Sequence, residues 1–212
     1  LTGLTKLPSQ MAIGATWDID LAEQVGEVLG EELNVLGVNL LLGPNLDVLE
    51  TTNVEAASSL GVNTYGGDPF WVGEMGKSFI NGVHIGSGNR ILVVAQNFPG
   101  TGNSDRSPDM EVATVRKSLE QLKQIELAPY FTVTTPPVGD PGRVDGVMVS
   151  HIRYHGFQGN IRATTRPISF DSNALSQIMA LPEFASWWED GGLVISDNLG
   201  SGAVRRFFDP ND

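Results

Sequence analysis

The stretch GLVISDNL, residues 192–199, places a continuous apolar run immediately before a carboxylate, Asp197. An apolar run of this length is typical of a strand buried on both faces, as strands of parallel sheets are. Asp197 would then follow the carboxyl end of the strand, where parallel α/β folds gather their chemistry. The structural alternative for Asp197 is that its side chain caps the next helix.

Three earlier apolar runs also end in polar residues. Residues 38–42 lead into Asn45 and Asp47, residues 91–95 into Gln96 and Asn97, and residues 147–149 into Ser150 and His151. Because the carboxyl ends of parallel strands meet at one edge of a sheet, these four runs together predict a functional site at that edge.

Helical patterns alternate with the apolar runs. Helices are expected at residues 18–36, 69–83, 109–127, 171–179 and 184–189, with a further one beginning within 202–208, and long loops at 45–65 and 153–167. Helices that alternate with strands imply right-handed crossovers and a parallel sheet. The sequence therefore predicts a single α/β domain over residues 1–212.

The composition argues against several classes of protein. The formal net charge of -12 opposes binding to nucleic acid or to anionic membrane surfaces. The absence of cysteine excludes disulfides and thiolate metal sites. No apolar run approaches the roughly 18 residues of a membrane span. Leu1 is not an initiator and no signal peptide is recognisable, so we expect the N-terminus to be processed, truncated or incomplete.

Six short stretches resemble, in the same order, motifs of the N-terminal domain of glycoside hydrolase family 3, which includes β-glucosidases and β-N-acetylglucosaminidases. They are residues 7–18 (LPSQMAIGATWD), 42–48 (LGPNLDV), 64–69 (TYGGDP), 98–102 (FPGTG), 149–152 (VSHI) and 195–199 (ISDNL). The resemblance covers nearly the whole chain. It implies a (β/α)8 barrel of the TIM type, incomplete in this stretch, with the site at its C-terminal rim.

The resemblance also implies a reaction. An exo-acting, retaining β-glycosidase would hydrolyse terminal β-linked sugars: one carboxylate attacks the anomeric carbon and a second group protonates the leaving oxygen. Carried over by position, Asp197 is the nucleophile, and Asp47 and His151 line the sugar pocket or brace it. The alternatives are a purely structural role for Asp47 and a hydrogen-bonded core histidine for His151.

Three positions depart from the family pattern. Asn63 stands where the family has an arginine, and Gln96 and Asn97 stand where it has a Lys-His pair that precedes Phe-Pro-Gly. The family residues donate hydrogen bonds to sugar hydroxyls. Amide side chains still donate, but charge-assisted bonds are about twice as strong. Asn63, Gln96 and Asn97 remain the expected substrate-binding residues.

The acid that protonates the leaving group is not fixed by the motifs. Residues 103–109 (NSDRSPD) hold no histidine, whereas the glucosaminidase branch has an Asp-x-His loop there. Asp105, Asp109 or Glu111 is the candidate proton donor within this chain. The alternative is an acid outside the chain, as in the β-glucosidase branch.

About four strands do not close a barrel that needs eight. By the resemblance, the family domain begins about three strands earlier and continues beyond the nucleophile strand. We therefore expect the missing strands to come from the same polypeptide or from a partner chain. Strands at 38–42 and 192–196 would be open, apolar edges, so residues 1–212 are not expected to fold as an isolated monomer.

Two other functions are compatible with the sequence. A catalytically degenerate carbohydrate-binding or structural relative of the family would explain the loss of the charged sugar contacts. A metal-dependent hydrolase on the same barrel would need clustered ligands, but His84, His151 and His155 form no HxH or HExxH motif, so neither a metal nor another cofactor is expected. The expected partner is a carbohydrate, and the expected location is extracytoplasmic, because glycosidases that act on polymers are often exported.

Overall fold

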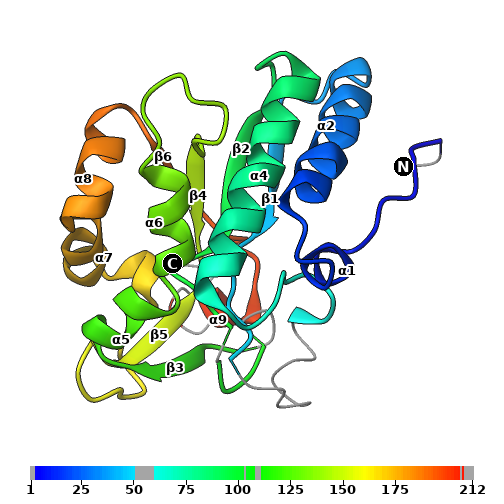
Figure 1. Cartoon of the computed structure of the whole chain (residues 1–212). Helices are drawn as coiled ribbons and strands as arrows, with labels where there is room; N and C mark the ends of the chain where they lie inside the picture. Colours follow the sequence, from blue (N-terminus) through cyan, green and yellow to red (C-terminus); the bar gives the residue numbers. More distant parts are fainter. Residues whose placement is uncertain (1–2, 51–59, 103, 108–110, 206, 208–212) are drawn as a thin grey trace.

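The four apolar runs form one parallel sheet in the computed structural model of the chain, which describes residues 3–50, 60–102, 104–107, 111–205 and 207 (Figure 1). The strand order is β1-β2-β4-β6, and every neighbouring pair is parallel. The strands are β1 (Leu40–Asn45), β2 (Leu92–Phe98), β4 (Gly146–Val149) and β6 (Leu193–Ser196). The predicted α/β fold with about four parallel strands is therefore confirmed.

Helices cover one face of this sheet. The described helices are α1 (Gln10–Gly14), α2 (Ile19–Val35), α4 (Pro69–Ser87), α5 (Leu119–Gln124), α6 (Ala128–Thr134), α7 (Ser172–Met179), α8 (Pro182–Glu189) and α9 (Gly202–Arg205). Figure 1 shows α8, α6, α4 and α2 side by side across the sheet. Among the described residues, no helix combines the length and the apolar character needed to cross a bilayer.

Three of the helices begin near the residues expected from the sequence, and an aspartate side chain caps each of them. Asp18 accepts hydrogen bonds from two backbone N–H groups in the first turn of α2, at 3.0 and 3.1 Å. Asp68 caps α4 in the same way, and Pro69 is the first residue of that helix. Asp171 caps α7. Each cap stabilises its helix by about 1 kcal/mol, because it satisfies donors that the helix itself leaves unpaired.

The helices α2 and α4 pack with their backbones in contact. A Cβ atom on Gly82 of α4 would lie 2.0 Å from the backbone oxygen of Glu23 in α2. A Cβ atom on Gly26 of α2 would lie 2.2 Å from the backbone oxygen of Phe79. Only glycine allows so close an approach, so these positions fix how α4 packs against α2. The pair of helices is thereby held in place over the edge of the sheet that it covers.

The opposite face of the sheet is exposed toward the amino ends of the strands, whereas Val94 and Met148, which share this face, are buried. Leu40, Leu42, Leu92 and Leu193 share this face by strand register, and 41–48% of their surface is exposed. The strands β1 and β6 are the two edges of the sheet, as expected. The prediction that residues 192–196 are buried on both faces is wrong here, because an apolar run does not distinguish a central strand from an edge strand.

The helix predicted over residues 109–127 is also wrong. Within it, Ala113–Lys117 forms strand β3, which pairs in parallel with β5 (Ile152–Gly156) in a second, two-stranded sheet. The strand β5 occupies residues that were expected to be a loop. The β-branched pair Thr114 and Val115 favours a strand, and the helix α5 begins only after Ser118, which forms a capping box.

Candidate active site

The carboxyl ends of the four parallel strands bring four of the predicted site residues to one end of the sheet. Asp47 follows β1, Asn97 lies near the end of β2, His151 follows β4 and Asp197 follows β6. Direct contacts join neighbouring strands at this end: Asn97 Nδ2 donates to Asp47 Oδ2 at 2.8 Å, and the Asp197 backbone N–H donates to the Val149 oxygen at 3.0 Å. The geometry is the one expected of a site at the rim of a barrel.

Asp47 is the centre of a buried hydrogen-bond network. Its carboxylate is fully buried and accepts bonds from the Thr101 N–H at 2.5 Å and the Thr101 hydroxyl at 2.9 Å, in addition to Asn97. Burial raises the pKa of the Asp47 carboxyl, and the bonds from Thr101 and Asn97 oppose that rise. Because the carboxylate has no access to solvent, these contacts favour the bracing role of Asp47 over direct contact with a sugar.

The three amide side chains lie around this network. Asn97 is half-buried, and its side-chain nitrogen is held by Asp47. Gln96 is half-buried, and its backbone oxygen accepts the Leu46 N–H at 2.5 Å. Asn63 is exposed in the turn before Thr64, whose hydroxyl donates to the Asp47 backbone oxygen at 2.8 Å. Asp47 therefore positions both the turn that holds Asn63 and the end of the strand that holds Asn97.

His151 is buried and braces the end of β6. Its Nδ1 lies 2.7 Å from Ser169 Oγ, and its Nε2 lies 3.2 Å from the backbone oxygen of Asn198. Its ring stacks on Phe170 with centroids 5.3 Å apart. With 1% of its surface exposed, His151 matches the alternative of a hydrogen-bonded core histidine, and it holds the residue next to Asp197.

Asp197 is half-buried and extends the ladder between β4 and β6 through its backbone. Its carboxylate accepts the N–H of Asn198 at 2.6 Å. The helix α9 begins only at Gly202, and no described hydrogen bond joins the Asp197 carboxylate to it. The capping alternative is therefore not what the structure shows, and the carboxylate remains at the rim.

The candidate acids lie in the segment between β2 and β3. Arg106 contacts both described candidates: its Nε lies 3.3 Å from Asp105 Oδ1 and its Nη1 lies 2.6 Å from Glu111 Oε2. Asp105 also accepts the Thr114 N–H at 2.8 Å, which anchors this segment to β3. Asp109 lies outside the described residues. Arg106 therefore links the two carboxylates, and a proton donor among them would act beside this guanidinium.

A buried ion cluster supports the site, and the sequence analysis missed it. Lys117, at the end of β3, contacts Glu126 Oε1 at 2.5 Å and also Glu50. Burial raises the pKa of the Glu126 carboxyl to about 7, and the bond from Lys117 opposes the rise. Next to this cluster, the Tyr154 hydroxyl donates to the Gly100 oxygen at 2.6 Å. Sequence patterns give little sign of this cluster, because Glu126 lies nine residues beyond Lys117 in another element and Glu50 lies 67 residues before it.

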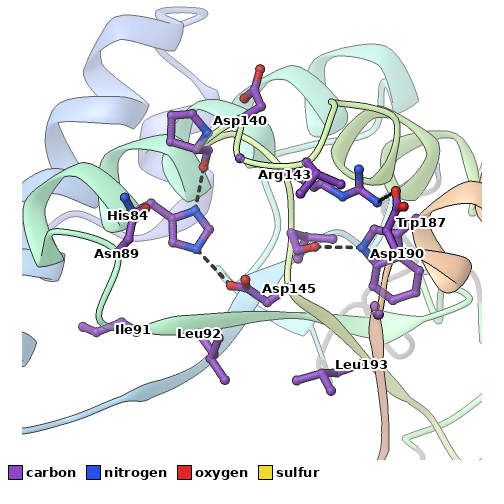
Figure 2. Close-up of a pocket in the computed structure, with 16 residues that line it drawn as sticks. His84, Asn89, Ile91, Leu92, Asp140, Arg143, Asp145, Trp187, Asp190 and Leu193 are labelled. Carbon is purple, nitrogen blue, oxygen red and sulfur yellow. Dashed lines mark hydrogen bonds and ion pairs between the residues drawn. The ribbon is translucent and has the colours of Figure 1, made fainter.

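A different pocket, of about 410 Å³, lies at the amino ends of the strands (Figure 2). Leu92 and Leu193, the first residues of β2 and β6, line it together with charged side chains. Those side chains are engaged with one another: Arg143 Nη2 lies 2.8 Å from Asp190 Oδ2. His84 bridges Pro141 and Asp145 in the same pocket. Because barrels of this type carry their active sites at the carboxyl ends of the strands, the candidate active site is the one at the other end.

No set of three or more histidine, aspartate or glutamate side chains within the described ranges is arranged to hold a metal ion.

Comparison with known families identifies a match along the chain. The model of the family described as "Glycosyl hydrolase family 3 N terminal domain" matches residues 1–212. Curated relatives named "Beta-hexosaminidase" include one from Hydrogenovibrio crunogenus, 23% identical over 98% of this chain and 53% of the relative. Another, from Nitrosomonas eutropha, is 26% identical over 97% of this chain and 54% of the relative. The chain thus spans about half the length of these relatives.

Solved structures give the same result. A glycoside hydrolase family 3 β-N-acetylglucosaminidase from Paenibacillus sp. str. FPU-7 superposes with a TM-score of 0.81 at 26% identity, covering 98% of this chain and 36% of that one. A fungal multi-domain β-N-acetylglucosaminidase of the same family gives a TM-score of 0.81 at 27% identity, covering 95% of this chain and 22% of that one. CbsA from Thermotoga neapolitana, at 22% identity, shares the fold with a TM-score of 0.79, over 99% of this chain and 40% of that one.

Proposed function

This chain belongs to glycosyl hydrolase family 3, as an N-terminal domain of that family, and on that premise we propose that it forms part of the active site of a retaining, exo-acting β-glycosidase. The names of the relatives favour a terminal β-linked N-acetylhexosamine as the sugar removed. The exposed leucines on this face of the sheet support the further proposal that additional barrel strands cover them in the working enzyme.

The observation that best supports this proposal is the position of Asp197. It is a half-buried carboxylate at the carboxyl end of β6, and Asn198 beside it is held by buried His151. A nucleophile has to be fixed within reach of the anomeric carbon, and a braced strand end fixes it better than a loop does. Asp197 would attack the anomeric carbon and form a glycosyl ester, which water then hydrolyses.

The amide side chains would hold the sugar while this happens. Asn97 is oriented by Asp47 through one bond, and its amide can donate another to a sugar hydroxyl. Asn63 is exposed on the adjoining turn. The proton for the leaving oxygen would come from Asp105, Asp109 or Glu111, or from a group outside this chain. Asp47 and His151 act as braces.

Replacement of Asp197 tests the proposal. In the protein that contains residues 1–212, Asp197→Ala should lower turnover of an aryl β-N-acetylglucosaminide by at least about three orders of magnitude, because the nucleophile is lost. Asp20→Asn, at an exposed carboxylate in the first turn of α2, is the matched control and should keep full activity. Activity of the Asp197 variant equal to that of the control would refute the assignment.

Carbohydrate binding without turnover is a second candidate function. The amides at Asn63, Gln96 and Asn97 favour it, since they replace charged residues of the family pattern. The same preparation distinguishes the two: binding of N-acetylglucosamine oligosaccharides by a protein that hydrolyses no aryl glycoside supports the second function and contradicts the first.

A further inference from the structure

A second cavity, of about 250 Å³, lies apart from the pocket at the amino ends of the strands, with which it shares no lining residue. It is enclosed by α1, by the segment that leads into α2, and by the start of α4. Its walls include Trp17, Tyr65 and Trp71, and its lining also includes Gly14 and Asp68. A Cβ atom on Gly14 would lie 1.9 Å from the Tyr65 backbone oxygen, so this part of the lining has no room for a larger side chain.

Aromatic rings are exposed around this cavity. Trp17 is 60% exposed, and its ring meets Trp71 edge to face with centroids 5.3 Å apart. Phe70 is 62% exposed and meets Trp71 at 5.5 Å. Trp17 also has a φ of 57°, in the left-handed region that is sterically unfavourable for a bulky side chain. Strained positions of this kind are concentrated at ligand sites, and here the strain accompanies an indole held out toward solvent.

One carboxylate completes the cavity. Asp68 uses its Oδ1 to cap α4, accepting the N–H groups of Phe70 and Trp71 at 2.9 and 3.2 Å. Among the described residues no hydrogen bond uses its Oδ2, which leaves an acceptor free at an exposed position. Sugars present apolar C–H faces that stack on aromatic rings and hydroxyl groups that donate to carboxylates. The cavity offers both kinds of contact within the space of about one sugar ring.

The cavity lies at the same end of the molecule as the candidate active site. His84, near the end of α4, lines the pocket at the amino ends of the strands, so the start of α4 lies toward the carboxyl ends. The chain also joins the two places: the Thr64 hydroxyl donates to the Asp47 backbone oxygen and accepts the Gly66 N–H at 3.2 Å. The cavity wall is therefore continuous with the turn that holds Asn63.

We propose that Trp17, Phe70, Trp71 and Asp68 form an accessory sugar-binding subsite that takes one saccharide unit of a β-linked glycan. This inference rests on the proposed function for the identity of the sugar. The subsite would retain a polymeric substrate on the protein while its terminal sugar occupies the active site. It would have no effect on a substrate that carries a single sugar.

Oligosaccharide binding tests this subsite. The β-1,4-linked hexasaccharide of N-acetylglucosamine is titrated by calorimetry into the wild-type protein and into the Trp17→Ala, Phe70→Ala and Trp188→Ala variants. Trp188 is the matched control, because it is 50% exposed on α8, away from the cavity. Loss of one stacked aromatic ring should weaken binding about fivefold in the first two variants and leave the control unchanged. Turnover of the aryl monosaccharide substrate should be the same in all four proteins.

The outcomes of this experiment distinguish a failure of the subsite proposal from a failure of the proposed function. Hexasaccharide binding that is unchanged in Trp17→Ala and Phe70→Ala, or equally weakened in Trp188→Ala, overturns the subsite even if the aryl glycoside is hydrolysed. Binding that depends on Trp17 in a protein without hydrolytic activity supports the subsite and contradicts the proposed reaction. Thermal melting shows whether each variant is folded. If Trp17→Ala does not fold, hexasaccharide binding by Phe70→Ala decides whether the subsite exists.

Discussion

Replacing His84 with alanine is expected to destabilise the protein more strongly near pH 6 than near pH 9. The ring of His84 lies between two acceptors: Nδ1 is 2.6 Å from the Pro141 oxygen and Nε2 is 2.9 Å from Asp145 Oδ2 (Figure 2). A neutral imidazole donates only one hydrogen bond, so both contacts are made only by the imidazolium. Burial lowers the pKa of His84, but the bonds to Asp145 and Pro141 outweigh it and raise the pKa above the ordinary 6.5.

The size of the effect follows from the two bonds. Hydrogen bonds to a charged group contribute about 1.5–3 kcal/mol each. Because the variant loses both bonds and leaves Asp145 with one donor fewer, its free energy of unfolding should fall by about 3 kcal/mol. For a domain of about this size that corresponds to a fall of roughly 6–12 °C in Tm. Asp140, Arg143 and Asp190 also line this pocket, and Arg143 is already paired with Asp190.

The pH dependence has a definite sign. Because the folded-state pKa of His84 is raised, its contribution is fully present below pH 6.5 and is lost as the pH rises through the folded-state pKa. Urea unfolding of wild type and His84→Ala at pH 6 and pH 9 measures this directly. If the free energies of unfolding of wild type and His84→Ala differ by the same amount at both pH values, the reasoning is refuted.

Three further predictions concern packing and the brace of the site. Gly82→Ala should lower the free energy of unfolding by about 1–3 kcal/mol, because its Cβ would overlap Glu23; denaturation curves within 0.5 kcal/mol of wild type would contradict this. Lys117→Met should lower the free energy of unfolding by about 3–5 kcal/mol, because Glu126 loses its counter-charge. A melting temperature equal to that of wild type would contradict this prediction. Asp47→Ala should reduce kcat on the aryl glycoside by at least about tenfold while the protein stays folded, because a misplaced binding group slows the reaction; unchanged kinetics would exclude the bracing role.

Sequence patterns predicted the parallel sheet because each apolar run is local and continuous. They failed over residues 109–127, where apolar positions at helical spacing belong to two elements: Val115 lies in β3, whereas Leu119 and Leu122 lie in α5. A stripe that crosses an element boundary imitates a single helix, and the capping serine at 118 was the local sign of that boundary.

The candidate site was predictable only in part. The strand ends that hold Asp47 and Asp197 follow from the order of elements, since parallel strands present their carboxyl ends together. The burial of Asp47 and His151 was not predictable, because it depends on Thr101 and on the segment after β5. The ion pair between Lys117 and Glu126 depends on tertiary packing in the same way.

The most direct test of the account is to trap the glycosyl ester on the nucleophile. The protein that contains residues 1–212 is incubated with a ring-fluorinated N-acetylglucosaminyl fluoride, whose glycosyl ester forms faster than it hydrolyses, and is then digested and analysed by mass spectrometry. The account predicts one added sugar on the peptide that contains Asp197 and none in the Asp197→Ala variant. A label on another carboxylate, or steady turnover of an aryl glycoside with no label on Asp197, would contradict it.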